Sequence, residues 1–119
     1  ALGHNVAASL TVLGDVAGKT AILIDDMIDT GGTIGAGARL LRDRGATRVL
    51  ACATHAVFSP PAIERLSATG LFEEVVVTNS IPLTADRRFP QLRVLSVANM
   101  LGEAIWRIHE ESSVSSMFR

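Results

Sequence analysis

Four short apolar runs divide the chain, each ending in polar or glycine-bearing residues before a helical pattern begins. The runs lie at Ala21–Ile24, Val49–Ala53, Val75–Val77 and Val94–Val97. All but the last are apolar throughout instead of alternating, which is typical of strands covered on both faces. We therefore expect a mainly parallel sheet flanked by helices, with its strands covered on both faces.

Three helices are predicted between and after these runs. Each shows apolar residues three or four positions apart, with charged residues on the other faces. A glycine at the end of the first and paired prolines at the start of the second are typical helix boundaries. The predicted helices cover residues 34–45, about 60–70 and about 98–109. Strands that alternate with helices indicate an α/β fold of right-handed βαβ units.

An N-terminal hairpin is expected ahead of the first βαβ unit. Ser9–Leu13 has the pattern of a strand, and the turn at residues 14–18 joins it to the run at Ala21–Ile24. The one long loop candidate is Pro82–Gln91, which carries two adjacent arginines. We interpret it as a solvated loop; contact of its arginines with a phosphate from a neighbouring subunit is the alternative.

The composition is that of a folded single domain. The chain has 119 residues, of which 48% are hydrophobic and 19% charged, and its mean hydropathy is +0.34. These values exclude a disordered chain. A net charge of −1 argues against nucleic acid as a partner, because neutralising many phosphates calls for a basic protein. No apolar run approaches the roughly 20 residues of a membrane span, so no membrane partner is expected.

The cysteine count and the N-terminal sequence indicate the compartment. Cys52 is the single cysteine, which excludes an internal disulfide and a multi-cysteine zinc site and fits a reducing cytosol. It lies inside an apolar run, so we interpret it as a buried small hydrophobe. The N-terminal sequence lacks the basic and apolar blocks of a signal peptide. We expect a cytoplasmic domain.

The segment ILIDDMIDTGGT is the most informative part of the chain. In open α/β sheets, ligands bind at the carboxyl ends of strands, where this segment is expected to lie. Its glycines allow close approach of the backbone, and the helix start that follows offers free N–H groups to a phosphate. We call two parts of it the acid pair (Asp25 and Asp26) and the glycine turn (Asp29, Thr30, Gly31, Gly32 and Thr33).

The acid pair indicates what kind of phosphate compound would bind. Carboxylates repel a phosphate but accept hydrogen bonds from the two donors of a vicinal diol. Acids beside a phosphate-binding turn therefore favour a sugar phosphate, and Mg²⁺ bridging is a further option. A short motif of this kind also occurs as an ordinary strand–helix turn. Core packing, however, gives no reason for two adjacent acids at the end of a buried strand.

Receiver domains of response regulators also place an acid pair after a first strand. They require a phosphoacceptor aspartate after a later strand and a lysine farther on. This chain has no aspartate between Asp43 and Asp86, and its single lysine, Lys19, precedes the acid pair. The receiver interpretation fails.

The sequence resembles a known family, the ribose-phosphate pyrophosphokinases, which share the type I phosphoribosyltransferase fold. The matching segments are LGDVAGKTAILIDDMIDTGGT, GATRVLACATHAVFSPPAIERL, EEVVVTNSIPL, LRVLSVANMLGEAIWRIH and SVSSMF. They occur in the family's order from about Asn5 onward. The resemblance implies that residues 1–119 are one domain, the ribose-5-phosphate-binding C-terminal domain of a longer two-domain enzyme.

The resemblance also implies an activity and residue roles. The family transfers the diphosphoryl group of ATP to the 1-hydroxyl of ribose 5-phosphate, with Mg²⁺. The acid pair would then bind the ribose hydroxyls, and the glycine turn would bind the 5-phosphate. Ser113, Ser115 and Phe118 match tail positions that contribute to a regulatory site for ADP or phosphate between subunits of a homo-oligomer.

The sequence departs from the family in what it lacks. The ATP site and the magnesium-binding His and Asp belong to an upstream domain, and the catalytic Lys and Arg belong to a loop that would precede residue 1. Residues 1–4 do not match that loop. We therefore expect weak ribose 5-phosphate binding and no turnover from this chain alone. A non-catalytic binding or regulatory module and a base phosphoribosyltransferase are the alternatives, although nothing here resembles the base-enclosing hood of the latter.

Several remaining residues have a structural and a functional interpretation. His55 follows an apolar run at the functional edge of the sheet, and we interpret it as capping local backbone more readily than as facing the ligand. Asn79 either lines the same cleft or begins a turn. Trp106 falls off the main stripe of the last helix and is either an interface residue or a partly exposed core edge. The three histidines are too scattered for a metal site.

Overall fold

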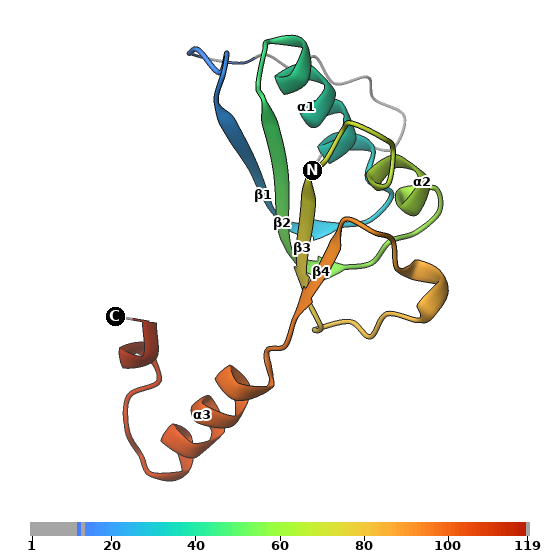
Figure 1. Ribbon diagram of the computed structural model, residues 1–119. Helices are drawn as coiled ribbons and strands as arrows, with labels where there is room; N and C mark the ends of the chain where they lie inside the picture. Colours follow the sequence, from blue (N-terminus) through green and yellow to red (C-terminus); the bar gives the residue numbers. More distant parts are fainter. Residues whose placement is uncertain (1–11, 13, 119) are drawn as a thin grey trace.

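The computed structural model describes residue 12 and residues 14–118, which form a parallel sheet followed by an extended C-terminal segment (Figure 1). The expected α/β fold is confirmed. The expected strand at Ser9–Leu13, and with it the N-terminal hairpin, lies largely outside the described residues. The elements are β1 (Thr20–Ile28), α1 (Gly32–Asp43), β2 (Arg48–Ala56), α2 (Ala62–Leu66), β3 (Glu74–Thr78), β4 (Leu92–Leu95) and α3 (Ala98–His109), with short 3₁₀ turns at Ala85–Arg87 and Ser115–Phe118.

The sheet is parallel throughout, with the strand order β1-β2-β3-β4. Asp25 of β1 lies opposite Ala53 of β2, which in turn lies opposite Val77 of β3. The carboxyl ends of all four strands therefore meet at one edge of the sheet. β1 is longer than predicted, because it continues through the acid pair to Ile28.

The core lies between the sheet and the two helices α1 and α2. Small or branched residues of β2 and β3 are fully covered on this face, which lets the helices approach closely. Phe58 and Phe89 close one end of this layer with their ring centroids 5.9 Å apart. The largest fully buried side chains are Phe58, Leu66, Val49, Val75 and Val77.

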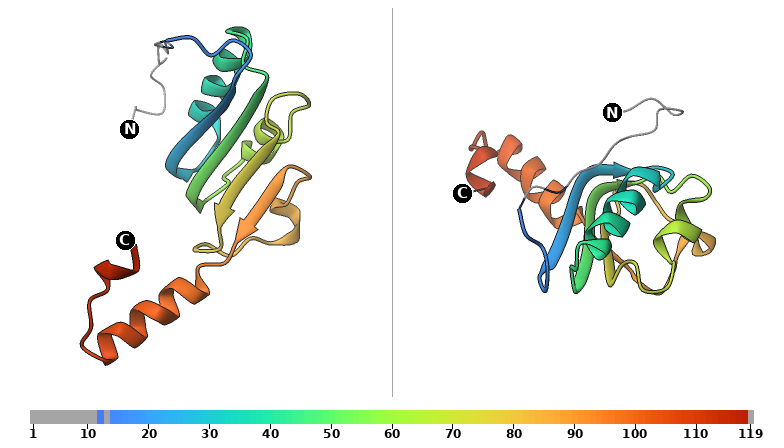
Figure 2. Two further views of the ribbon diagram at one scale, coloured as in Figure 1. Left: turned by 60° about the vertical axis from the view of Figure 1, so that its left-hand side comes forward. Right: turned by 90° about the horizontal axis from the view of Figure 1, so that it is seen from above.

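The opposite face of the sheet is open, so the expectation that the strands are covered on both faces is wrong for the described part of the chain (Figure 2). Ile22 and Ile24 of β1 are 57% and 81% exposed, and Leu95 of β4 is 51% exposed. The reason is topological. Right-handed crossovers that advance in one direction along a sheet place their connections on the same face. Covering the other face would require the strand order to reverse, and in β1–β4 it does not.

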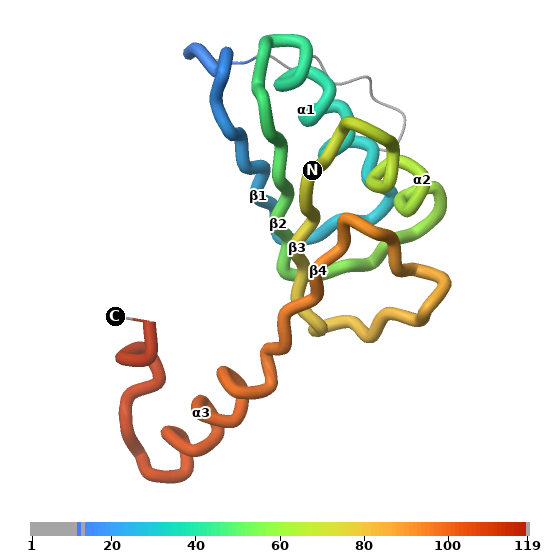
Figure 3. Tube along the Cα trace, in the orientation of Figure 1, coloured from blue at the N-terminus to red at the C-terminus, as the bar shows by residue number. Residues whose placement is uncertain are grey.

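Helix α3 extends away from the end of β4 and contributes no buried residue (Figure 3). The predicted apolar stripe is present, but Leu101, Ile105 and Ile108 are all exposed, as is Trp106. The radius of gyration is 16.8 Å, whereas a compact chain of this length would have about 13.5 Å. Helix α3 and the open face of the sheet are therefore the two large unpartnered apolar surfaces of the described structure.

Other details also differ from the predictions. The second helix ends at Leu66, short of Gly70, and Ser67 bonds back to the carbonyl of Ile63. Arg87 is not a purely solvated loop residue, because its guanidinium donates to the carbonyl oxygen of Val57 at 3.1 Å. Cys52 is only partly buried, since its side chain belongs to the open face. No described helix is both long and apolar enough to cross a membrane.

Candidate functional site

The glycine turn joins the carboxyl end of β1 to the first turn of α1. Gly31 has φ 75° and ψ 6°, a left-handed conformation that glycine adopts at little cost. The helix begins at Gly32, and its first bond runs from the Gly35 N–H to the Gly31 carbonyl oxygen at 2.9 Å. No side chain caps this helix start. Its first N–H groups are therefore free to bind an anion.

A cavity of about 530 Å³ lies at this turn and is lined by ten consecutive residues. The acid pair forms one part of the lining and the glycine turn another. All seven binding residues predicted from the sequence therefore line a single cavity. The lining residues are Asp25, Asp26, Met27, Ile28, Asp29, Thr30, Gly31, Gly32, Thr33 and Ile34.

The two carboxylates of the acid pair are exposed, and each accepts a hydrogen bond from the backbone N–H of the next residue. The Asp26 N–H donates to Asp25 Oδ1 at 2.7 Å, and the Met27 N–H donates to Asp26 Oδ1 at 2.8 Å. The pKa of Asp26 is lowered, first by hydrogen bonding with the Asp25 side chain and then by the Met27 N–H. Asp26 is therefore an ionised hydrogen-bond acceptor at neutral pH.

Arg65 of α2 is a residue of the site that sequence reasoning missed. Its Nη1 donates to the carbonyl oxygen of Thr30 at 3.2 Å, and a Cβ built on Gly32 would lie 3.0 Å from the same nitrogen. The packing of α2 beside α1 thus brings a positive charge onto the glycine turn. The two segments are 35 residues apart, and no local pattern in the sequence joins them.

Polar residues of β2 and β3 occupy the same sheet edge. His55 does not cap local backbone as we expected, because its Nδ1 lies 2.7 Å from the Ser80 hydroxyl oxygen. Asn79 follows β3, and its Oδ1 accepts from the Val97 N–H at 2.9 Å. The Asn79 side chain therefore fixes the passage from β4 into α3.

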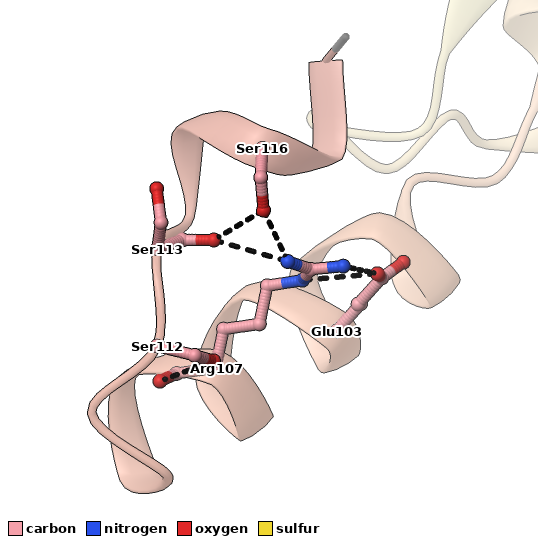
Figure 4. Close-up of polar contacts among 5 residues, drawn as sticks. All are labelled: Glu103, Arg107, Ser112, Ser113 and Ser116. Atoms are coloured by element: carbon pink, nitrogen blue, oxygen red, sulfur yellow. Dashed lines mark hydrogen bonds and ion pairs between the residues drawn. The ribbon is translucent and has the colours of Figure 1, made fainter.

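The C-terminal residues form a separate polar cluster (Figure 4). The guanidinium of Arg107 binds Glu103 on one side and, on the other, the carbonyl oxygen of Ser113 at 3.1 Å and the Ser116 hydroxyl. Phe118, at the end of the 3₁₀ turn Ser115–Phe118, is 69% exposed. The Ser113 and Ser115 hydroxyls lie 2.9 Å apart. The three candidate regulatory residues thus lie together in the segment 113–118 that follows α3, and not at the cavity.

The acid pair is a suitable partial site for Mg²⁺. Among residues 12 and 14–118, no cluster of three or more His, Cys, Asp or Glu side chains could hold a metal ion. Mg²⁺ in phosphate-binding sites typically takes one or two protein carboxylates, completing its shell with phosphate oxygens and water. Two carboxylates beside the glycine turn fit that chemistry. Asp25 and Asp26 are the residues that would hold the ion.

The parallel sheet is covered by helices on one face and carries an acid pair and a glycine-rich turn at its carboxyl edge. These features place the chain among α/β proteins that have a ligand cavity at the carboxyl ends of their strands. The chain belongs to the family described as "Phosphoribosyl synthetase-associated domain", whose model matches residues 3–119. The family resemblance found in the sequence is confirmed, and the match begins two residues earlier than Asn5.

Individual relatives agree with this assignment. The chain is 84% identical over 117 residues to "Ribose-phosphate pyrophosphokinase" of Prochlorococcus marinus (strain MIT 9313), covering 98% of this chain and 35% of the relative. It is 63% identical over 117 residues to "Ribose-phosphate pyrophosphokinase 1" of Spinacia oleracea, covering 98% of this chain and 34% of that protein. The chain thus spans about a third of the length of these relatives and corresponds to their C-terminal part.

A solved structure supports the fold. The phosphoribosylpyrophosphate synthetase from Mycobacterium smegmatis superposes with a TM-score of 0.80 at 54% sequence identity. The match covers 84% of this chain and 33% of that chain. The parallel sheet with its flanking helices is therefore the fold of the matched part of that enzyme.

Proposed function

We propose that this chain provides the ribose 5-phosphate site of a ribose-phosphate diphosphokinase, which transfers diphosphate from ATP to ribose 5-phosphate. The observation that carries the proposal is the single cavity, in which the acid pair and the glycine turn adjoin each other. A sugar phosphate has the matching chemistry, with hydroxyl donors at one part and an anion at another.

Each part of the lining has a distinct role in this proposal. The N–H groups of the glycine turn bind the 5-phosphate, and the Thr30 and Thr33 hydroxyls add donors. Arg65 holds the turn through the Thr30 carbonyl and contributes a positive charge beside the phosphate. Asp25 and Asp26 accept hydrogen bonds from the ribose hydroxyls. This orients the sugar, which is the contribution that positioning makes to phosphoryl transfer.

Mg²⁺ would neutralise charge on the transferred phosphates when it binds with them at the acid pair. ATP would bind to groups outside this chain. The cavity lining contains no lysine or arginine, although diphosphoryl transfer depends on neutralising phosphate charge. We therefore propose that the chain alone binds ribose 5-phosphate without turnover. ADP or phosphate would act as regulators through Ser113, Ser115 and Phe118 in the homo-oligomeric enzyme.

The proposal is tested by calorimetric titration of the chain with ribose 5-phosphate, with and without Mg²⁺. Ribose serves as the control for the phosphate requirement. We expect saturable binding that needs the phosphate and is weakened by Asp25→Asn. The matched control is Asp43→Asn, the same change at the exposed far end of α1. Absence of binding at millimolar ligand by a folded chain would refute the proposal for this chain.

A further inference from the structure

His55 lies beside the acid pair but on the neighbouring strand. It is the second residue from the end of β2, and its register partner on β1 is Met27, the residue that follows Asp26. The imidazole is exposed. His55 therefore lies at the same sheet edge as the acid pair, next to the ten residues that line the cavity but not among them.

The hydroxyl of Ser80 fixes this imidazole. Ser80 Oγ lies 2.7 Å from His55 Nδ1 and 3.2 Å from the carbonyl oxygen of Thr54. The Ser80 N–H donates to Thr78 Oγ1 at 3.1 Å, and that hydroxyl itself donates to the Thr54 carbonyl at 2.7 Å. Ser80 is thus held by β2 and β3 together, at the point where both strands end.

The single hydrogen of the Ser80 hydroxyl decides which imidazole nitrogen carries the proton. That hydrogen can go to the Thr54 carbonyl oxygen at 3.2 Å or to His55 Nδ1 at 2.7 Å. When it goes to Thr54, Ser80 Oγ accepts from His55, which requires a proton on Nδ1. In the neutral imidazole, Nε2 is consequently an unprotonated acceptor.

We infer that His55 is a ligand-contacting residue, whose Nε2 accepts a hydrogen bond from a sugar hydroxyl of a pentose phosphate bound at the acid pair. Ser80 is its positioning residue, because it selects the tautomer in which Nε2 can accept. This inference rests on the proposed ribose 5-phosphate site. It adds a neutral acceptor on β2 to the two carboxylates on β1.

The tautomer is tested first, without any ligand. Nitrogen-15 spectra of the histidine side chains at pH 8 should show His55 protonated at Nδ1. Ser80→Ala should shift the population toward the Nε2-protonated form, whereas Ser80→Thr, which keeps a hydroxyl, should not. Exposed His109 on α3 is an internal reference in the same spectra. A parent chain with His55 protonated at Nε2 would overturn the inference.

The ligand contact is tested by titrating ribose 5-phosphate into His55→Asn and His55→Gln. The Asn amide can replace Nδ1 and keep the bond to Ser80, but it does not reach the position of Nε2. We expect His55→Asn to weaken binding about five- to tenfold, the effect of one lost hydrogen bond, and His55→Gln to recover part of it. His109→Asn is the matched control and should bind like the parent.

The outcomes separate this inference from the proposed function. If His55→Asn binds like the parent while Asp25→Asn binds more weakly, the His55 contact is wrong and the ribose 5-phosphate site stands. If the folded parent chain binds no ribose 5-phosphate, both fail together. Weaker binding by His55→Asn and by Ser80→Ala, with unchanged thermal unfolding, would support the inference.

Discussion

The left-handed conformation of Gly31 gives the sharpest test of the site's geometry. The same substitution at Gly35, four residues later, is expected to have the opposite effect on stability. Gly31→Ala places a methyl group where its nearest neighbours are 3.6–3.8 Å away, so no clash results. The cost is the backbone conformation alone, since φ is 75°. Left-handed strain of about 1–2 kcal/mol, less the entropy that alanine removes from the unfolded chain, leaves a net destabilisation near 1 kcal/mol.

Gly35→Ala is the matched control within helix α1. A Cβ at this position would displace no neighbour, since nothing lies within 4 Å of it. Alanine favours the helix interior over glycine by about 1 kcal/mol, so this variant should be more stable than the parent. The same chemical change should therefore have opposite signs at two positions one helical turn apart.

Thermal unfolding followed by circular dichroism measures this difference. For a chain of this size, 1 kcal/mol moves Tm by about 3–6 °C, so the two variants should differ by about 6–12 °C. Calorimetry should then show weaker ribose 5-phosphate binding by Gly31→Ala, whose turn N–H groups are displaced, and parent-like binding by Gly35→Ala. Equal Tm values for the two variants would refute the left-handed geometry of the turn.

Three further predictions concern other parts of the molecule. Arg65→Met should weaken ribose 5-phosphate binding about tenfold, because it removes a charge-assisted hydrogen bond to the glycine turn. The control is Arg39→Met, the same change on exposed α1, and equal affinities of the two variants in calorimetry would contradict the prediction. Arg107→Gln should speed hydrogen exchange at the Met117 amide without lowering Tm, because the guanidinium joins the C-terminal turn to α3; unchanged exchange would count against that role. Ile24→Lys should reduce self-association of the chain through its open sheet face, and a parent chain that sediments as a stable monomer at high concentration would be evidence against it.

Asp26 supplies a prediction about pH. Its folded-state pKa lies below the model-compound value of 3.8, chiefly because of hydrogen bonding with Asp25. Ionised Asp26 therefore favours the folded state above the ordinary aspartate pKa, and this contribution is lost as pH falls through the lowered folded-state value. A carbon-13 titration of the Asp26 carboxyl should give a midpoint below 3.8. A midpoint at or above that value would contradict the hydrogen bonding described here.

The parts of the fold that the sequence predicts are those that local patterns determine. Apolar runs located the strands, and glycine and proline marked helix ends, because both signals act within a few residues. The acid pair and the glycine turn lie on consecutive residues, so their placement in one cavity also followed from a local motif. The one-sided sheet could not be predicted this way. Ile24 has the same local pattern whether or not a helix covers it, and strand order alone decides the difference.

The missed contacts have a common physical origin. Arg65 reaches Thr30 across 35 residues, and His55 reaches Ser80 across 25. Each depends on which strands and helices are neighbours in space. A lone arginine on a short helix, or a lone histidine after a strand, carries no pattern that identifies its partner. The partners of such residues become evident only once the sheet order brings the carboxyl ends of β1, β2 and β3 together.

The contrast between local and long-range structure also bears on which part of the proposed function the chain can perform alone. The cavity lining is one stretch of ten residues, so its shape depends mainly on β1, α1 and the bond from Arg65. Those elements are packed on the covered face of the sheet, whereas most of the exposed large apolar residues lie on the open face and on α3. Exposure of the open face would therefore reduce the solubility of the chain before it altered the cavity. Ribose 5-phosphate binding should persist in the chain alone, and diphosphoryl transfer should require the groups that neutralise the ATP phosphates.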